Sequence, residues 1–224
     1  MEAHRNPFRV ECLEALAYRP SAGCLPGGAG EDTPETWRDA LLDRLIRRGG
    51  RGALVGPKGL GKTTLLEAMG RDLARRGYRV VWLRLSCERR AVDWRTLRRD
   101  LNPGGKCLAL LLDGAEQLNL ARWWRVRLLA RRATVLLVTT HRPGRLPTLH
   151  RHAASPELLG DLVRALLDNT VHPYPDYEQL QTLFQRHDGN LRECLRTLYD
   201  RYSSPSILFP LGLNRNRLRS HPPA

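Results

Sequence analysis

One stretch of eight residues constrains the fold of this chain more than any other feature. The stretch reads Gly56-Pro57-Lys58-Gly59-Leu60-Gly61-Lys62-Thr63. It follows a short apolar segment at 53–55 and precedes a helical pattern at 64–69, so it joins a predicted strand to a predicted helix. Its glycines allow the backbone N–H groups to point inward at a helix N-terminus, where they form a nest for an anion. The stretch therefore predicts an α/β domain with a phosphate site at the strand-to-helix turn.

The spacing G-x-x-x-x-G-K-[ST] is that of the P-loop, which predicts binding of a nucleoside triphosphate. We expect Lys62 to reach the β- and γ-phosphates and the Thr63 hydroxyl to join the ligands of a Mg²⁺ ion. ATP is the nucleotide we expect, since the guanine-reading pattern Asn-Lys-x-Asp is absent, although this absence does not by itself select adenine. The residues expected to contact the nucleotide are Gly56, Pro57, Lys58, Gly59, Leu60, Gly61, Lys62, Thr63 and Thr64.

A second informative stretch runs from Cys107 to Asp113. Its apolar run follows a Gly-Gly turn and ends in an acid, which is typical of a parallel strand that is buried on both faces. The aspartate would emerge at the carboxyl edge of the sheet, where ligands bind in open α/β folds. Because a P-loop precedes it, we interpret Asp113 as a Walker B residue that holds Mg²⁺ through water. Another buried strand, predicted over 133–140, ends in Thr139 and Thr140, where a hydroxyl can orient the attacking water or contact the γ-phosphate.

The rest of the chain divides by pattern. We expect an N-terminal lead-in over 1–35, an ATPase core over 36–172, a small helical lid over 173–203 and a mobile tail over 204–224. The lid is predicted from two helical patterns with a turn between them. The tail is rich in Pro, Ser, Asn and Arg, a composition typical of segments that cannot form a packed core.

The formal net charge is +14, and its distribution is more informative than its total. Between Glu116 and Glu157 the chain has no acidic residue, so this interval carries charge of one sign and can attract polyanions. Trp123 or Trp124 can stack on unpaired bases, but adjacent helix positions point about 100° apart, so we expect one of them in the core. Either a nucleic acid binds over 122–151, or the arginines there form a solvated surface. They are Arg122, Arg125, Arg127, Arg131, Arg132, Arg142, Arg145 and Arg151.

The cysteines and the apolar runs bear on the compartment. Five cysteines are scattered without a C-x-x-C pair, which argues against a zinc site or a disulfide framework. We expect Cys107 and Cys194 to be buried reduced thiols. The N-terminal segment lacks the apolar core of a signal peptide, and no apolar run approaches the roughly 18 residues of a membrane helix. The sequence predicts a soluble cytoplasmic protein without membrane contact.

Over residues 36–203 the order of these motifs resembles that of the AAA+ ATPases. The likeness is to compact bacterial members associated with transposition and secretion, and to the clamp-loader ATPases. It implies an α/β P-loop NTPase fold with three αβα layers, a mostly parallel five-stranded sheet in the order 5-1-4-3-2, and a small C-terminal helical lid. It also implies an ATPase that couples its nucleotide state to holding a partner protein or a nucleic acid.

The resemblance also implies roles for three further residues. The segment Val138-Thr139-Thr140-His141 is similar to a sensor 1 strand end, with Thr140 as the polar sensor. The segment Gly189-Asn190-Leu191-Arg192 is similar to a sensor 2 signature, which implies that Arg192 approaches the γ-phosphate. Arg151 matches the position of the arginine finger in clamp loaders. A finger acts on the ATP of a neighbouring subunit, so this match implies a homo-oligomer.

One departure from the AAA+ pattern affects the catalytic step. Most of these ATPases have a glutamate directly after the Walker B aspartate, whereas here Gly114 follows Asp113 and the next acid is Glu116. Glu116 is either the general base, if it reaches the attacking water, or a first-turn glutamate favoured by the helix dipole. The sequence therefore predicts ATP binding and leaves two hypotheses open, a hydrolysing ATPase and a nucleotide-dependent scaffold. A small-molecule kinase is disfavoured, because no acceptor pocket is evident.

Overall fold

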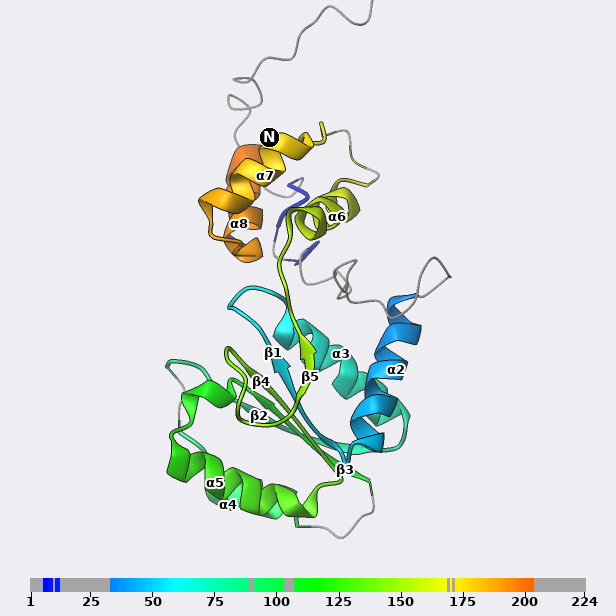
Figure 1. The fold of residues 1–224 in the computed structure, drawn as a ribbon, viewed down its shortest axis with the longest axis vertical. Coiled ribbons are helices and arrows are strands. Elements are labelled where there is room, and N and C mark those ends of the chain that lie inside the picture. The colour runs from blue at the N-terminus through cyan, green and yellow to red at the C-terminus, as the bar shows by residue number, and fades with distance from the viewer. Residues whose placement is uncertain are drawn as a thin grey trace, which may run out of the picture.

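The computed structural model consists of a five-stranded sheet covered by helices, with a separate cluster of three helices beyond one edge of the sheet (Figure 1). The expected tail over 204–224, most of the lead-in and Cys24 lie outside the part of the chain that it describes. The described residues are 6–9, 11–12, 33–88, 91–102, 107–168, 170 and 172–203.

The sheet is parallel throughout and has the strand order β2-β3-β4-β1-β5. This order is the one that the AAA+ resemblance implied, read from the other edge. The predicted apolar runs form the central strands, because residues buried on both faces of a parallel sheet have to be apolar. The edge strand β5 has no such run and was not located from the sequence. The strands are β1 (Arg51–Val55), β2 (Arg79–Arg84), β3 (Leu108–Asp113), β4 (Val135–Thr140) and β5 (Thr148–Arg151).

Helices cover both faces of the sheet and make the three predicted αβα layers (Figure 1). On one face, α2 (Pro34–Arg47) and α3 (Lys62–Arg75) bury their apolar sides against the sheet. On the other face, α4 (Trp94–Asp100) and α5 (Leu120–Leu129) pack through Leu97, Trp123 and Val126. Two short 3₁₀ turns flank α5, namely η3 (Ala115–Gln117) and η4 (Ala130–Arg132).

The helical cluster contains α6 (Pro156–Leu167), α7 (Tyr177–Arg186) and α8 (Leu191–Ser203) around one apolar core. Helix α6 belongs to this core, whereas the sequence assignment placed it in the ATPase core and began the lid at residue 173. The N-terminal segment also joins the cluster. Phe8 is buried in it, and the Asn6 side chain donates to the backbone carbonyl of Tyr199 in α8 over 2.8 Å.

Side-chain caps explain where most of these helices begin. Each N-cap residue has an extended backbone and a side-chain oxygen that accepts from a backbone N–H of the first turn, which satisfies a donor that the helix itself leaves open. The capping residues are Thr33 of α2, Asp93 of α4, Asn119 of α5, Ser155 of α6 and Asp176 of α7. Helix α3 has no such cap and begins at Gly61 of the P-loop, which leaves its first N–H groups available to a ligand.

The sequence predicted that Cys107 and Cys194 are both buried. Cys194 is buried in α8, as expected, but Cys107 is exposed just before β3, so its predicted burial was wrong. The apolar run begins one residue later, at Leu108.

Among the described residues, no helix combines the length and the apolar character that a membrane span requires.

Candidate functional site

The P-loop lies between the end of β1 and the start of α3, and its glycines are required by its shape. Gly59 and Gly61 have φ angles of +85° and +73°, in the left-handed region that other residues rarely adopt. Gly56 faces the segment after β5, and a Cβ there would lie 2.8 Å from the Cβ of His152. The Gly56 N–H donates to the carbonyl of Thr140 at the end of β4 over 3.2 Å. The loop is therefore fixed at the carboxyl edge of the sheet, as the motif predicted.

Lys62 is buried inside this loop with 8% of its surface exposed. Its Nζ donates to the carbonyl of Pro57 over 2.6 Å, so the ammonium lies across the loop. Burial lowers the pKa of Lys62 from its ordinary value, and the negative charges of Glu116 and Asp113 act in the opposite direction. A lysine held between the P-loop and two carboxylates is positioned to contact phosphate oxygens.

Asp113 connects three elements at the carboxyl edge of the sheet. The Thr63 hydroxyl, in the first turn of α3, donates to Asp113 Oδ2 over 3.0 Å. The Thr139 hydroxyl of β4 donates to Asp113 Oδ1 over 2.5 Å and accepts from the Gly114 N–H over 2.8 Å. The aspartate and the P-loop threonine thus meet, as the Walker A and Walker B interpretation required.

The donor set at Asp113 and Thr63 fits a magnesium ion. Both side chains offer oxygen ligands, which Mg²⁺ prefers, and Mg²⁺ usually takes only one or two protein ligands beside water and substrate phosphates. Within the part of the chain that the structure describes, no group of three or more His, Cys, Asp or Glu side chains could cage a metal alone. An ion shared between protein and phosphate is therefore the kind of site these residues can make.

The two threonines that end β4 have different surroundings. Thr139 contacts Asp113, whereas the Thr140 hydroxyl donates to the carbonyl of Arg142 over 3.0 Å and so faces the following loop. Successive strand residues point to opposite faces, so only one of the pair can face Asp113. The sequence favoured Thr140 as the polar sensor. Thr139 and His141 lie beside the carboxylates, and the role of Thr140 stays a prediction.

Glu116 reaches the site by way of a glycine turn. Gly114 has a φ of +81°, and a Cβ at this position would lie 2.5 Å from the carbonyl oxygen of Leu85. The turn leads into η3, where Glu116 Oε1 lies 3.3 Å from His141 Nε2. Glu116 Oε2 is buried and has no hydrogen-bond partner among the described residues. The negative charge of Glu116 also acts to raise the pKa of Lys62, against the effect of burial.

The pairing of Glu116 with His141 was not predicted. The sequence placed His141 only within a sensor-like strand end, and nothing in the spacing of the two residues indicates contact. The signal that could have found it is topological. Both residues follow neighbouring parallel strands, β3 and β4, and therefore emerge at the same edge of the sheet.

The first turn of the last helix touches the P-loop. A Cβ at Gly59 would lie 2.4 Å from Asn190 Oδ1 and 3.3 Å from the Cβ of Arg192. Leu60 of the P-loop is 6% exposed and packs in the apolar core of the helical cluster. Arg192, the predicted sensor 2 residue, is thus placed beside the P-loop, with an exposed side chain. The cluster contacts the loop directly, as a lid would (Figure 1).

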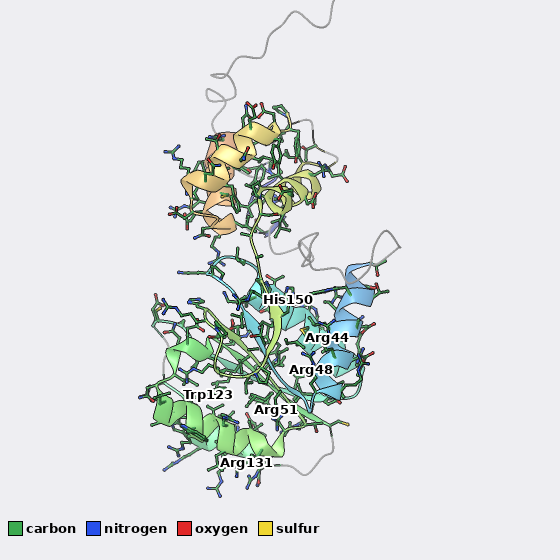
Figure 2. The ribbon with its side chains drawn as sticks, viewed as in Figure 1. Arg44, Arg48, Arg51, Trp123, Arg131 and His150 are labelled. Atoms are coloured by element: carbon green, nitrogen blue, oxygen red, sulfur yellow. The ribbon has the colours of Figure 1, made fainter. Side chains whose placement is uncertain are left out.

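His152, directly after β5, packs against the P-loop, and His150 of β5 packs against His152, a burial that no sequence pattern indicated. His152 Nδ1 lies 3.0 Å from the carbonyl oxygen of Leu60, which can only accept, so Nδ1 carries the proton. The His150 ring contacts the His152 ring at 4.8 Å and the Trp37 ring at 5.1 Å (Figure 2 labels His150). Burial lowers the pKa of His152 to about 3 and that of His150 to about 4, so both rings are neutral at pH 7.

Arg151, the predicted arginine finger, ends β5 beside Val55 of β1 and is exposed. It therefore lies on the outer strand of the sheet, at the same carboxyl edge as the P-loop. Its action on a neighbouring subunit stays a prediction.

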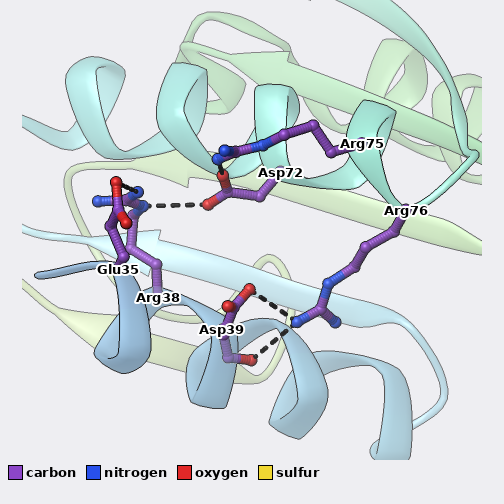
Figure 3. Close-up of a pocket in the computed structure, with 6 residues that line it drawn as sticks. All are labelled: Glu35, Arg38, Asp39, Asp72, Arg75 and Arg76. Atoms are coloured by element: carbon purple, nitrogen blue, oxygen red, sulfur yellow. Dashed lines mark hydrogen bonds and ion pairs between the residues drawn. The ribbon is translucent and has the colours of Figure 1, made fainter. Parts of the chain in front are cut away.

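A separate charged cavity of 320 Å³ lies between α2 and α3, away from the P-loop (Figure 3). The buried carboxylate of Asp72 accepts from Arg38 over 3.0 Å and from Arg75. Arg76 donates to Asp39 over 2.9 Å and thereby joins the same two helices. A buried charge requires such partners, and we interpret this network as structural.

Comparison with known proteins identifies the fold. No protein-family model and no curated protein matches the sequence. Among solved structures, the chain is similar to the replication initiator DnaA bound to AMPPCP and single-stranded DNA, with a TM-score of 0.52, 16% identity, and coverage of 76% of this chain and 61% of that chain. It is also similar to a RuvB variant from Thermotoga maritima, with a TM-score of 0.53, 16% identity, and coverage of 80% and 67%.

A third similar structure is ORC1 from Aeropyrum pernix in complex with DNA, with a TM-score of 0.50, 18% identity, and coverage of 74% of this chain and 59% of that chain. The chain thus spans about three fifths of the DnaA and ORC1 chains. All three proteins are AAA+ P-loop ATPases, and their strand order is that of the sheet described above. The chain has the fold of these three proteins.

Proposed function

We propose that this protein is a Mg²⁺-dependent ATPase that couples its nucleotide state to holding a protein or nucleic-acid partner. The observation that carries the proposal is the meeting of Lys62, Thr63 and Asp113 at the carboxyl edge of the sheet, with Thr63 Oγ1 3.0 Å from Asp113 Oδ2. Two motifs far apart in the sequence are thereby combined into one polar site beside a glycine-rich loop.

In the proposed reaction, water attacks the γ-phosphate in line with the leaving group. The P-loop N–H groups and Lys62 would bind the phosphates, and Thr63 and Asp113 would hold Mg²⁺. When bound, Mg²⁺ supplies positive charge that offsets the charge of the phosphates. Glu116 accepts the proton of the attacking water, which its buried and unpartnered Oε2 is suited to do. His141 positions Glu116, and Arg192 stabilises charge that develops on the γ-phosphate.

The assignment of Glu116 as the base is supported by its contacts. A glutamate that served only the helix dipole would face solvent at the start of η3, whereas this carboxylate is half-buried, pairs with His141 and acts on Lys62. The alternative is a scaffold that binds ATP without hydrolysing it. It is favoured by Gly114, which replaces the usual Walker B glutamate.

Two features support a nucleic acid as one kind of partner. The similar DnaA and ORC1 structures contain DNA. In this chain, Arg142 and Arg151 are exposed at the carboxyl edge of the sheet, within the interval that has no acidic residue. Arg151 would also serve as the finger of a homo-oligomer, in which one protomer completes the site of the next.

The decisive experiment measures binding of a fluorescent ATP analogue and release of phosphate. Lys62→Ala should weaken Mg-ATP binding on the order of 10- to 100-fold, because it removes a hydrogen-bonded charge from the phosphates. Glu116→Gln should keep the affinity and lose turnover by on the order of 10²-fold or more, since the amide cannot accept the proton. Arg71→Ala, at an exposed cation on α3, is the matched control and should change neither quantity.

The outcomes separate the two hypotheses. Unchanged ATP binding by Lys62→Ala would exclude the nucleotide site itself. Wild-type phosphate release no greater than that of Lys62→Ala, with or without added single-stranded DNA, would exclude the ATPase and leave the scaffold. Stimulation by DNA that falls as salt rises would support the nucleic-acid partner, because phosphate contacts are salt-dependent.

A further inference from the structure

The outward face of α5 carries a continuous apolar stripe. Leu120, Trp124 and Leu128 are 72%, 62% and 60% exposed, respectively. They are four residues apart, a spacing that places them in one row along an α-helix. Three large apolar side chains in a row on one exposed helix face are unusual, since isolated exposed apolar residues are normal but contiguous patches mark interaction sites.

Packing among the residues that the structure describes does not account for this stripe. Helix α5 is attached to the sheet by its opposite side, where Trp123 and Val126 are buried. Figure 2 labels Trp123 on the sheet side of the helix, and Figure 1 shows α5 on the outside of the molecule, far from α6, α7 and α8. Of the two adjacent tryptophans, the sequence correctly required one in the core, and Trp124 is the one left outside.

Arginines border the stripe and define the charge of what can cover it. The Arg127 guanidinium lies over the Trp124 ring, 5.3 Å from its centroid. Arg125 lies on the other side of the stripe, 4.4 Å from the centroid of the Trp94 ring of α4. Arg131 follows at the end of the helix (Figure 2), and no acidic residue occurs between Glu116 and Glu157. A complementary surface must therefore be apolar along its centre and acidic at its edges.

We propose that α5 is a docking site for an acidic amphipathic helix of a partner protein. A stripe with a spacing of four residues matches the ridge of a second helix, and the arginines would pair with carboxylates on both sides of the ridge. A second copy of α5 is disfavoured as the occupant, because face-to-face pairing would place arginine rims against each other. Single-stranded nucleic acid is disfavoured, because two of the three apolar side chains are leucines, which offer no ring on which a base can stack.

This docking site does not depend on the nucleotide site. The stripe faces away from the sheet, whereas the P-loop, Asp113 and Glu116 lie at the carboxyl edge of the sheet. A partner bound along α5 would therefore leave access to the P-loop, and its binding would persist in the Lys62→Ala variant even if the proposed ATPase activity is wrong.

The test uses a fluorescently labelled synthetic peptide of roughly 18 residues, long enough to form helix, with leucines in one row and glutamates on both sides. Anisotropy should detect binding to the full chain, weaker binding at high salt, and no binding of a peptide that has the same composition in scrambled order. Trp124→Gln should weaken binding about tenfold or more, because an exposed aromatic beside an arginine is a typical hot spot. The double variant Leu120→Gln with Leu128→Gln should do the same.

Tyr177→Gln is the control variant, because Tyr177 is 53% exposed on α7, outside the stripe. It should bind the peptide as the wild type does, and circular dichroism should show that every variant is folded. Equal affinity for the scrambled peptide, or wild-type affinity in Trp124→Gln, would overturn the proposal. So would self-association of the wild type that Trp124→Gln abolishes, which assigns the face to a second copy. Binding of a labelled oligonucleotide that the same variants lose would assign it to nucleic acid.

Discussion

At the scale of single residues, Gly114 explains why this chain departs from the usual Walker B sequence. Its φ of +81° and the 2.5 Å approach of the Leu85 carbonyl exclude a side chain at this position. The chain turns there, and the next acid is Glu116, which contacts His141 and acts to raise the pKa of Lys62. The glycine and the displaced glutamate are therefore two parts of one local geometry.

We expect Gly114→Glu to harm the protein rather than to restore a catalytic glutamate. The left-handed backbone and the clash with Leu85 should each lower the free energy of unfolding, by on the order of 1–3 kcal/mol for the strain alone. Gly77→Glu is a matched control, because Gly77 has a φ of +83° and no atom within 4 Å of a Cβ there. Urea unfolding should show a larger loss for Gly114→Glu. Phosphate release faster than wild type would contradict this account.

The sequence could predict the P-loop, Asp113 and the two threonines that end β4, because each follows or precedes an apolar run that predicts a strand. The contacts of Glu116 and His141 could not. They depend on the 3₁₀ turn after Gly114, and a three-residue turn leaves no periodic signal. For a related reason the sequence could not show which of Thr139 and Thr140 contacts Asp113, since this depends on which face of β4 meets Asp113.

At the scale of secondary-structure elements, apolar periodicity located the central strands and most helices, but it did not show which elements pack against one another. Helix α6 has the same kind of apolar side whether it packs on a sheet or on other helices, so the sequence could not assign it to the lid. Strand β5 has only four residues and follows a loop, and neither His150 within it nor His152 directly after it is a residue type typical of a core, although both are buried. His152 nevertheless contacts the P-loop at Leu60 and Gly56, and His150 packs against His152.

The stability contributed by the contact between His152 and the P-loop should depend on pH. The pKa of His152 in the folded protein is about 3, below its ordinary value of 6.5, so folding favours the neutral ring. The stability that this contributes is complete above pH 6.5 and is lost progressively as the pH falls toward 3. His152→Asn keeps a donor near the Leu60 carbonyl but cannot be protonated in this range.

We therefore expect the free energy of unfolding of the wild type to fall between pH 6.5 and 5 more steeply than that of His152→Asn. The difference in slope should be at most about 1.4 kcal/mol per pH unit for one group. Urea unfolding at several pH values measures it, and the window ends at pH 5 so that carboxylates contribute little. His150→Asn should flatten the curve as well, because burial also lowers the pKa of His150, to about 4. Parallel curves for wild type and His152→Asn would refute the assignment.

At the scale of the whole molecule, the lid and the P-loop share a side chain. Leu60 belongs to the P-loop by sequence and to the core of α6, α7 and α8 by packing. Asn190 and Arg192 approach Gly59 from the lid side. The sequence identified each segment separately, but it contained nothing to show that an apolar P-loop residue is buried in the lid. Under the proposed function, a movement of the P-loop on nucleotide binding would pass to the lid through Leu60.

We expect Leu60→Ala to uncouple the lid from the nucleotide site. The backbone N–H groups that face the phosphates remain, so affinity for the ATP analogue AMPPCP should stay close to wild type. Truncation of a buried leucine costs about 2–5 kcal/mol, and Leu183→Ala, in the same core but away from the P-loop, controls for that loss. Hydrogen exchange should show that AMPPCP protects α8 in the wild type and in Leu183→Ala but not in Leu60→Ala. Equal protection in all three would mean that the lid responds through Asn190 and Arg192 alone, and the coupling role of Leu60 would be rejected.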